Sequence, residues 1–312
     1  MKEFEQAKKI LDKSQKVLIL LHQCPDGDTI ASSLAISTHL KRIGKEVDLA
    51  VNDLIPEIFH FLTNDVEIKK DFLLGDYDLI MAIDCGDARR TGFPVRLEQI
   101  AKSKPLINID HHLKNNLHKI AKVNLVDEKA SAAAEIVFDL LKYLKAEIDS
   151  KIATYILAGI YYDTGGFQHA NVTQRTLEIS SECLGLGGHI GMVAKKISAS
   201  KKPSGLKLWG IALSRMKLKT NGVVYTYLRS SDLKKVGAEI DEASGIVNLI
   251  NSVPQSKVAI LLIETPDGKI KASLRTESDD VDVSSIARIF GGGGHRKAAG
   301  FELSESFEQL GL

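Results

Sequence analysis

The chain has 312 residues, of which 44% are hydrophobic, so it is long enough for two ordinary domains with buried cores. Its 41 Lys and Arg residues nearly balance its 40 Asp and Glu residues, and the net charge of +1 excludes the overall basic field expected of a protein that binds long duplex nucleic acid. The three cysteines form no CxxC motif and no disulfide framework, and no apolar run approaches membrane-spanning length, so we expect a cytoplasmic protein.

The first strong signal is an apolar run that ends in a polar cluster. Residues 17–21 are apolar without alternation, which is typical of a strand buried on both faces. His22, Asp26 and Asp28 follow in a turn that contains Pro and Gly, and residues 29–43 have helical spacing. One imidazole and two carboxylates at the carboxyl end of a strand suit a divalent cation, with a polar turn and helix cap as the alternative.

The same pattern returns twice. After a strand at 46–51 and a short helix at 56–62, a strand at 78–83 ends at Asp84, and a strand at 105–109 ends at Asp110, His111 and His112. Because the carboxyl ends of parallel strands meet at one edge of a sheet, we expect these groups to converge. Crowded carboxylates repel one another unless a cation neutralises them, so the sequence predicts a metal site at this edge.

Helices follow over much of residues 130–197. Ser131 and Glu135 are interpreted as helix-capping residues, and further helices are predicted over 173–186 and 189–197. A largely apolar helix over 150–162 ends in Asp163, which is either a simple helix terminus or another carboxylate at the metal edge. A segment of small, polar and Pro/Gly residues at 198–205 marks a boundary. We therefore divide the chain into a catalytic domain at 1–195, a linker region at 196–215 and a substrate-binding domain at 216–312.

The last third has the character of a smaller α/β domain. Strands are predicted at 222–228, 257–263 and 269–274, the last two as a hairpin, with helices at 242–250 and 283–290. Four glycines, 291–294, have no expected packing use and instead predict a loop whose backbone N–H groups approach an anion, with a flexible linker as the alternative. The expected phosphate-binding residues are Arg275, Gly292, Gly293, Gly294, His295 and Arg296.

The candidate metal ligands outnumber what one ion requires, so we expect two ions that share a bridging carboxylate. The site as a whole contains His22, Asp26, Asp28, Asp84, His111, His112 and Asp163, and we count six ligands among them. Oxygen and imidazole ligands without thiolate favour Mn²⁺, with Mg²⁺, Co²⁺ or Zn²⁺ as substitutes. Two such ions activate water for attack on phosphorus. The expected fold is a mostly parallel sheet flanked by helices, linked to the smaller C-terminal domain, with the active site in the interdomain cleft.

These motifs resemble the DHH superfamily of phosphoesterases, which is named after the sequence found here at Asp110-His111-His112. The C-terminal part resembles the DHH-associated domain through its Gly-Gly-Gly-His-x-x-Ala-Ala-Gly signature at residues 292–300. The resemblance assigns His22 and Asp26 to one metal and Asp28, His111 and Asp163 to the other. It makes Asp84 the bridging ligand and directs His112 to the scissile phosphate.

The motif set is most similar to the nanoRNase and 3′-phosphoadenosine-5′-phosphate phosphatase subfamily. The resemblance implies hydrolysis of very short RNA to mononucleotides and of the bisphosphate to AMP. The alternatives are a phosphodiesterase of cyclic di-AMP or linear pApA, a manganese-dependent inorganic pyrophosphatase, and a nucleotide sensor without catalysis. Family members are often dimers, so a homodimer is a further expectation.

Overall fold

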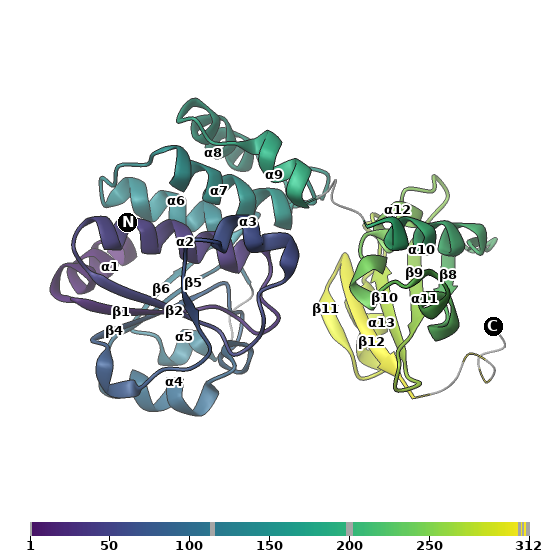
Figure 1. The fold of residues 1–312 in the computed structure, drawn as a ribbon, viewed down its shortest axis with the longest axis horizontal. Helices are drawn as coiled ribbons and strands as arrows, with labels where there is room; N and C mark the ends of the chain where they lie inside the picture. The colour runs from purple at the N-terminus through teal and green to yellow at the C-terminus, as the bar shows by residue number, and fades with distance from the viewer. Residues whose placement is uncertain (1, 113–115, 198–201, 305–306, 308, 310–312) are drawn as a thin grey trace. The chain divides into compact units, whose positions relative to one another are not determined.

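The structure, a computed structural model, describes residues 2–112, 116–197, 202–304, 307 and 309. The chain divides into two compact units, Met1–Ser200 and Lys201–Leu312 (Figure 1). Each unit has a sheet and a hydrophobic core of its own. The predicted α/β class, with a larger parallel-sheet domain and a smaller second domain, is confirmed.

The first unit is built on a parallel sheet. Among its described residues the strands number six, in the order β3-β2-β1-β4-β5-β6, and every neighbouring pair is parallel. The bounds are β1 Lys16–Leu20, β2 Glu46–Ala50, β3 Ile68–Lys69, β4 Leu79–Ile83, β5 Leu106–Asp110 and β6 Val123–Val126. The chain order reverses between β1 and β4. Open α/β sheets bind ligands beyond the carboxyl ends of the strands at such a switch point.

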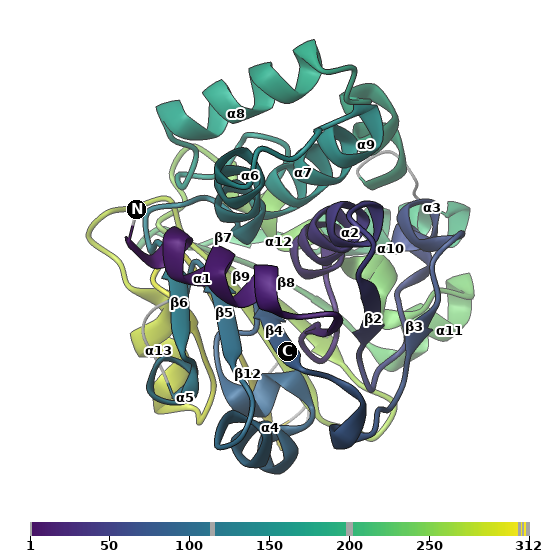
Figure 2. The same ribbon diagram turned by 90° about the vertical axis from the view of Figure 1, so that its left-hand side faces the viewer.

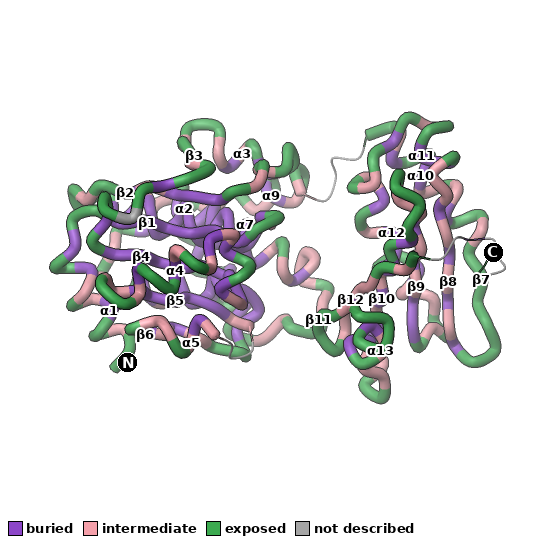
Figure 3. Tube along the Cα trace, turned by 90° about the horizontal axis from the view of Figure 1, so that it is seen from below, coloured by how far each residue is buried: buried purple, intermediate pink, exposed green. Residues whose placement is uncertain are grey.

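The unbroken apolar runs of β1 and β4 are explained by helices on both faces of the sheet (Figures 2 and 3). Val17 and Ile19 face a core formed with α1, α2, α6 and α7, whereas Leu18 and Leu20 face a core formed with α4 and α5. The helix bounds are α1 Lys2–Lys13, α2 Gly27–Arg42, α3 His60–Thr63, α4 Pro94–Ala101, α5 Leu117–Ile120, α6 Ala133–Tyr143, α7 Ser150–Asp163, α8 Gln174–Gly185 and α9 Ile190–Ile197, with short 3-10 turns η1 Glu57–Phe59, η2 Leu74–Asp76 and η3 Ala88–Thr91.

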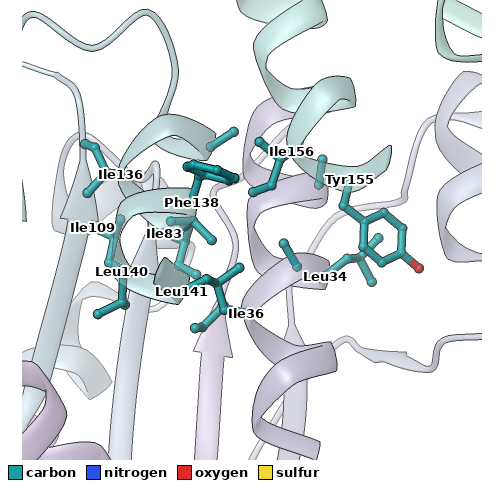
Figure 4. Close-up of a cluster of buried hydrophobic side chains, with 14 of the residues drawn as sticks. Leu34, Ile36, Ile83, Ile109, Ile136, Phe138, Leu140, Leu141, Tyr155 and Ile156 are labelled. Atoms are coloured by element: carbon teal, nitrogen blue, oxygen red, sulfur yellow. The ribbon is translucent and has the colours of Figure 1, made fainter. Parts of the chain in front are cut away.

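The core between α2, α6 and α7 fixes the positions of their polar ends. Leu34 of α2, Phe138 of α6 and Ile156 of α7 belong to one buried cluster with Ile83 and Ile109 of the sheet (Figure 4). Burying a side chain of this size contributes about 1.5–3 kcal/mol. The start of α2 and the end of α7 are therefore held together next to the carboxyl ends of β4 and β5.

The second unit has helices on both faces of a mixed sheet. Within its described residues the strand order is β11-β12-β10-β9-β8-β7, with β8 and β9 parallel and the other pairs antiparallel. The strands are β7 Lys217–Leu218, β8 Val223–Leu228, β9 Val258–Glu264, β10 Ile270–Arg275, β11 Gly293–His295 and β12 Ala298–Leu303. The helices are α10 Pro203–Ser214, α11 Ser230–Val236, α12 Ile246–Asn251 and α13 Val283–Ile289, with a 3-10 turn η4 at Ile240–Ala243.

This part of the chain contains one helix within the predicted linker and one interruption of a predicted helix. Helix α10 occupies most of the predicted linker, and its Leu208 and Ala212 are fully buried in the core of the second unit. The small and polar residues that precede these two positions concealed their helical spacing. The predicted helix over 242–250 is interrupted because Gly245, at φ 92°, separates η4 from α12.

The expectation that the four glycines have no packing use is wrong at Gly292 and Gly294. Gly293–His295 form β11, which pairs with β12. A Cβ at Gly292 would lie 2.2 Å from the carbonyl oxygen of Gly300, and one at Gly294 would lie 2.5 Å from that of Ala298. These glycines therefore let two backbone segments approach closely.

Candidate metal centre

The predicted ligands of the first unit converge at the switch-point edge of the sheet. His22 follows β1, Asp84 follows β4 directly, and His111 and His112 follow β5. Helix ends supply the other carboxylates: Asp26 caps α2, Asp28 lies in its first turn, and Asp163 is the last residue of α7. The structure thus brings together all seven side chains that the sequence singled out, in three overlapping groups whose ligand atoms lie within 4.8 Å of one another.

The first group is His22, Asp26 and Asp84. Nε2 of His22 lies 3.5 Å from Oδ1 of Asp26 and 3.7 Å from Oδ2 of Asp84. The His22 and Asp84 side chains are each 2% exposed, whereas that of Asp26 is 28% exposed. The group is therefore open to solvent through Asp26.

The second group is Asp28, His111 and Asp163. Nε2 of His111 lies 3.2 Å from Oδ2 of Asp163 and 3.3 Å from Oδ1 of Asp84. One oxygen of Asp84 thus contacts His22 and the other contacts His111. This carboxylate connects the two groups.

The imidazole rings are oriented so that each presents Nε2 to the carboxylates. Nδ1 of His22 lies 2.6 Å from the carbonyl oxygen of Gln23, and Nδ1 of His111 lies 3.2 Å from that of Ala130. A proton on each Nδ1 would satisfy these carbonyl oxygens and leave the lone pair on Nε2, which is the arrangement typical of metal-binding histidines.

Three buried atoms at the centre have no hydrogen-bond partner among the described residues. They are Nε2 of His22, Oδ1 of Asp84 and Nε2 of His111. Burying such atoms without a partner costs about 1–3 kcal/mol each. A cation bound between them would remove that cost, so the donor set fits a divalent metal ion.

Asp28 is held more firmly than the other carboxylates. It is fully buried, its Oδ2 accepts from the amide of Ala133 at 2.5 Å, and its Oδ1 accepts from Ala134 at 3.0 Å and from the Ser32 hydroxyl at 2.9 Å. The two amides belong to the first turn of α6, where unpaired N–H groups favour an anion. Asp28 therefore joins α6 to α2 and is also a member of the second group.

The charges of this cluster strongly perturb one another. Burial and the neighbouring Asp84 and Asp163 raise the pKa of Asp28 well above its usual range. Burial also raises the pKa of Asp163 to about 6, against the opposing contact with His111. Burial opposes ionisation of Asp84 as well, but its contacts with His111 and His112 outweigh burial and hold the pKa of Asp84 well below the usual value.

For the histidines, burial and the charged contacts shift the pKa in the opposite directions to those for the carboxylates. Burial would lower the pKa of His111, but Asp163 and Asp84 outweigh it and raise that pKa well above the usual value. In the same way Asp110 and Asp84 raise the pKa of His112 to about 9. A divalent cation would neutralise the carboxylates that repel one another and would replace the protons that the histidines retain.

Strand register places two of the predicted phosphate-binding residues of the second unit on the same face of the sheet. Arg275 of β10 and His295 of β11 both pair with Ala298 of β12, so their side chains lie on one face of the sheet with a small residue between them. Arg296 lies in the turn after β11, where its guanidinium donates to the carbonyl oxygen of Asp279. Gly293 and Gly294 are in β11, and Gly292 precedes it.

Comparison with protein families matches residues 16–160 to the N-terminal domain of the DHH family and residues 220–310 to the DHHA1 domain. A relative that is 31% identical covers most of the chain. The chain belongs to the DHH family. Membership in this family supports the predicted enzymatic class, a hydrolase.

Relatives within the family align over nearly the whole chain. The bifunctional oligoribonuclease and PAP phosphatase NrnA of Thermus thermophilus is 31% identical, over 94% of this chain and 87% of the relative. The protein of the same name from Bacillus subtilis is 25% identical, over 91% and 88%. The crystal structure of an exopolyphosphatase-related protein from Bacteroides fragilis matches with a TM-score of 0.90 at 25% identity, over 99% of this chain and 93% of that chain.

Sequence reasoning gave no site role to two residues that the structure places beside His112. Asp110, the first residue of the motif, faces inward: its Oδ1 lies 2.8 Å from Nδ1 of His112 and its Oδ2 accepts from the amide of Gly86 at 2.7 Å. Arg90 directs Nη1 toward Nε2 of His112 at 3.4 Å. The position of Asp110 at a strand end placed it at this edge in the sequence analysis without a role, whereas no sequence pattern distinguishes Arg90 from Arg89.

None of the helices in the described part of the chain has the length and apolar character needed to span a bilayer.

Proposed function

We propose that this chain is a two-metal phosphoesterase that hydrolyses very short RNA to mononucleotides and 3′-phosphoadenosine-5′-phosphate to AMP. The observation that carries the proposal is the convergence of three buried, unpartnered ligand atoms on His22, Asp84 and His111. The substrates are those named for the NrnA relatives that align with nearly the whole chain. The three cysteines are free, which is compatible with a reducing, cytoplasmic setting.

In this proposal the ligand groups hold two Mn²⁺ ions, for which Mg²⁺, Co²⁺ or Zn²⁺ could substitute. His22 and Asp26 would hold one ion, Asp28, His111 and Asp163 the other, and Asp84 both. Divalent ions at these positions would activate water for attack on phosphorus and neutralise phosphate charge.

The remaining residues act on the substrate. His112, fixed through Nδ1 by Asp110, orients the scissile phosphate or donates a proton to the leaving oxygen. Arg275, His295 and the glycines bind a phosphate or the terminal nucleotide. We accordingly assign residues 1–195 to catalysis and 216–312 to substrate binding. We also expect a homodimer, which light scattering would detect.

The test is a substrate panel assayed with Mn²⁺ and, in parallel, with chelator. The panel contains a labelled RNA dinucleotide, a five-nucleotide RNA, a 24-nucleotide RNA, 3′-phosphoadenosine-5′-phosphate, cyclic di-AMP, pApA and pyrophosphate. Fast turnover of the dinucleotide and the bisphosphate, with slow turnover of the long RNA, is the expected result. A preference for cyclic di-AMP or pApA would retain the chemistry and overturn the substrate assignment. Metal binding without turnover of any substrate would favour a sensor.

A further inference from the structure

Two neighbouring arginines follow β4 and have different environments. Arg89 donates through Nε to the carboxylate of Asp87 at 3.0 Å, and its side chain is 83% exposed. Arg90 is also exposed, but its Nη1 lies 3.4 Å from Nε2 of His112. Among the described residues, Arg90 therefore contacts a residue of the candidate site, whereas Arg89 pairs with Asp87.

The Arg90 guanidinium has no carboxylate partner among the described residues, because the nearby Asp87 pairs with Arg89. A guanidinium carries five N–H donors in a planar fork that matches two oxygens of a phosphate. The contact with His112 is long and uses one nitrogen. Most of the donor capacity of Arg90 is therefore available to an external anion.

Gly86 provides the space in which Arg90 and His112 meet. A Cβ at position 86 would lie 3.0 Å from Nη1 of Arg90 and 3.5 Å from Cγ of His112. Gly86 has φ 66°, and its amide donates to Asp110, the residue that also fixes His112. Because Gly86 has no Cβ, the side chains of Arg90 and His112 can both lie over its backbone.

The backbone of Arg90 is fixed to the metal centre independently of its side chain. Its carbonyl oxygen accepts from the amide of Gln23 at 2.5 Å, and the carbonyl oxygen of Gln23 contacts Nδ1 of His22 at 2.6 Å. The turn that carries Arg90 is therefore bound to the loop that carries a metal ligand. A side-chain substitution at position 90 would leave these backbone contacts in place.

We propose that Arg90 binds the phosphoryl group that is hydrolysed, with its guanidinium on the non-bridging oxygens next to His112. The inference rests on the proposed phosphoesterase function and assigns it a further substrate-binding residue. In hydrolysis the water oxygen bonds to phosphorus, the bond to the leaving ribose oxygen breaks, and that oxygen gains a proton. Negative charge on the non-bridging oxygens is stabilised by fixed cationic donors during this step.

The test compares Arg90→Ala with Arg89→Ala, a matched neighbour that is equally charged and outside the proposed site. With the RNA dinucleotide and 3′-phosphoadenosine-5′-phosphate, we expect Arg90→Ala to lower kcat/KM by about 100-fold or more, the usual cost of removing such a donor. Arg89→Ala should stay within about threefold of the wild type. Metal content and melting temperature should be unchanged in both variants.

Two additional measurements distinguish substrate binding from a structural role. Arg90→Lys should lie between the wild type and Arg90→Ala, because an ammonium keeps the charge without the fork. Free guanidinium ion should restore part of the activity of Arg90→Ala and leave Arg89→Ala unaffected. Calorimetric titration of the metal-loaded proteins with AMP should show weaker binding for Arg90→Ala alone.

The possible failures are distinguishable. If the wild type hydrolyses the substrates and Arg90→Ala matches Arg89→Ala, the inference is overturned and the proposed function remains. Loss of bound metal from Arg90→Ala would also overturn it, since Arg90 would then support the ligands. If the wild type hydrolyses nothing, the proposed function fails, and AMP titration still decides whether Arg90 binds phosphate. Should Arg90→Ala not fold, Arg90→Lys supplies the comparison.

Discussion

Gly159 of α7 lies directly against the carboxylate of Asp28 on α2. A Cβ at position 159 would lie 2.6 Å from Oδ1 of Asp28 and 2.7 Å from Cβ of Ala134. Alanine normally stabilises a helix interior by up to about 1 kcal/mol relative to glycine. Here overpacking should outweigh that gain, so we expect Gly159→Ala to destabilise the protein by about 1–3 kcal/mol and to weaken metal binding.

The matched control is Gly210→Ala. Gly210 is also inside a helix, α10, but a Cβ there would meet nothing within 4 Å. We expect this variant to be as stable as the wild type or more stable by about 0.5–1 kcal/mol, with normal metal content. Thermal unfolding and metal analysis compare the two. Equal behaviour of both variants would show that α7 can move away from Asp28 at little cost.

Asp84→Asn tests the carboxylate that joins the two ligand groups. Asp84 has φ 58°, a left-handed conformation that Asn tolerates and that would add strain to an Ala substitution. The amide keeps the shape of the side chain and removes the charge. We expect metal content to fall and turnover of the RNA dinucleotide to drop to the level seen with chelator. Retained metal-dependent turnover would contradict the role of Asp84 in holding both ions.

Metal removal should lower the stability of the first unit, because it leaves the buried atoms of His22, Asp84 and His111 without a partner. An ion present at 100 times its dissociation constant stabilises the native state by about 2.7 kcal/mol. We therefore expect dialysis against chelator to lower the melting temperature and added Mn²⁺ to restore it. The restoration should be absent in Asp84→Asn. A melting temperature independent of metal in the wild type would argue against a preformed site.

The convergence of the candidate metal ligands could be predicted from sequence because most of them follow apolar runs. In β1, β4 and β5 the strand ends are visible as the points where apolar residues give way to Asp or His, and parallel topology brings those points together. The ligand from α7 was harder to identify, because Asp163 reaches the site only through packing of α7 on α2. Arg90 was not identified at all, since the role proposed for it depends on which of two adjacent arginines Asp87 neutralises.

In the second unit, the sequence prediction for the glycine run failed for a different reason. A run of glycines indicates that a Cβ is not tolerated, but the sequence does not say whether a ligand or another backbone segment occupies the space. At Gly292 and Gly294 the neighbours are the backbone at Gly300 and Ala298. Strand register then produces an arrangement that sequence spacing does not reveal, with His295 and Arg275 on one face of the sheet.

His295→Ala tests whether that face binds phosphate. His295 is exposed in β11 and is not a member of the ligand groups of the first unit. We expect kcat/KM for the RNA dinucleotide and 3′-phosphoadenosine-5′-phosphate to fall by about 10-fold or more, with metal content unchanged. His60→Ala, an exposed histidine of α3, is the control. Loss of metal from His295→Ala would assign His295 to a different role.

The ion pair between Arg215 and Asp232 should make the stability of the second unit pH-dependent. Asp232, whose side chain is 9% exposed, accepts two hydrogen bonds from the Arg215 guanidinium and one from the amide of Arg229 at 2.8 Å. Burial opposes ionisation, but these donors outweigh it and hold the pKa of Asp232 below its usual value. Asp232→Asn should therefore destabilise this unit by about 1–3 kcal/mol at pH 7.

The sign of the pH dependence follows from the lowered pKa. The folded state binds a proton at Asp232 less readily than the unfolded state does, so this stabilisation is complete above the unfolded pKa of about 3.9 and is lost as pH falls through the lower folded value. Trp209 of α10, whose indole donates to the carbonyl oxygen of Glu242 at 3.1 Å, is the single tryptophan and reports on this unit by fluorescence. The difference in stability between wild type and Asp232→Asn should be constant from pH 5 to 8 and shrink below about pH 4. A difference that persists unchanged into acid would mean that Asp232 acts through packing instead of charge.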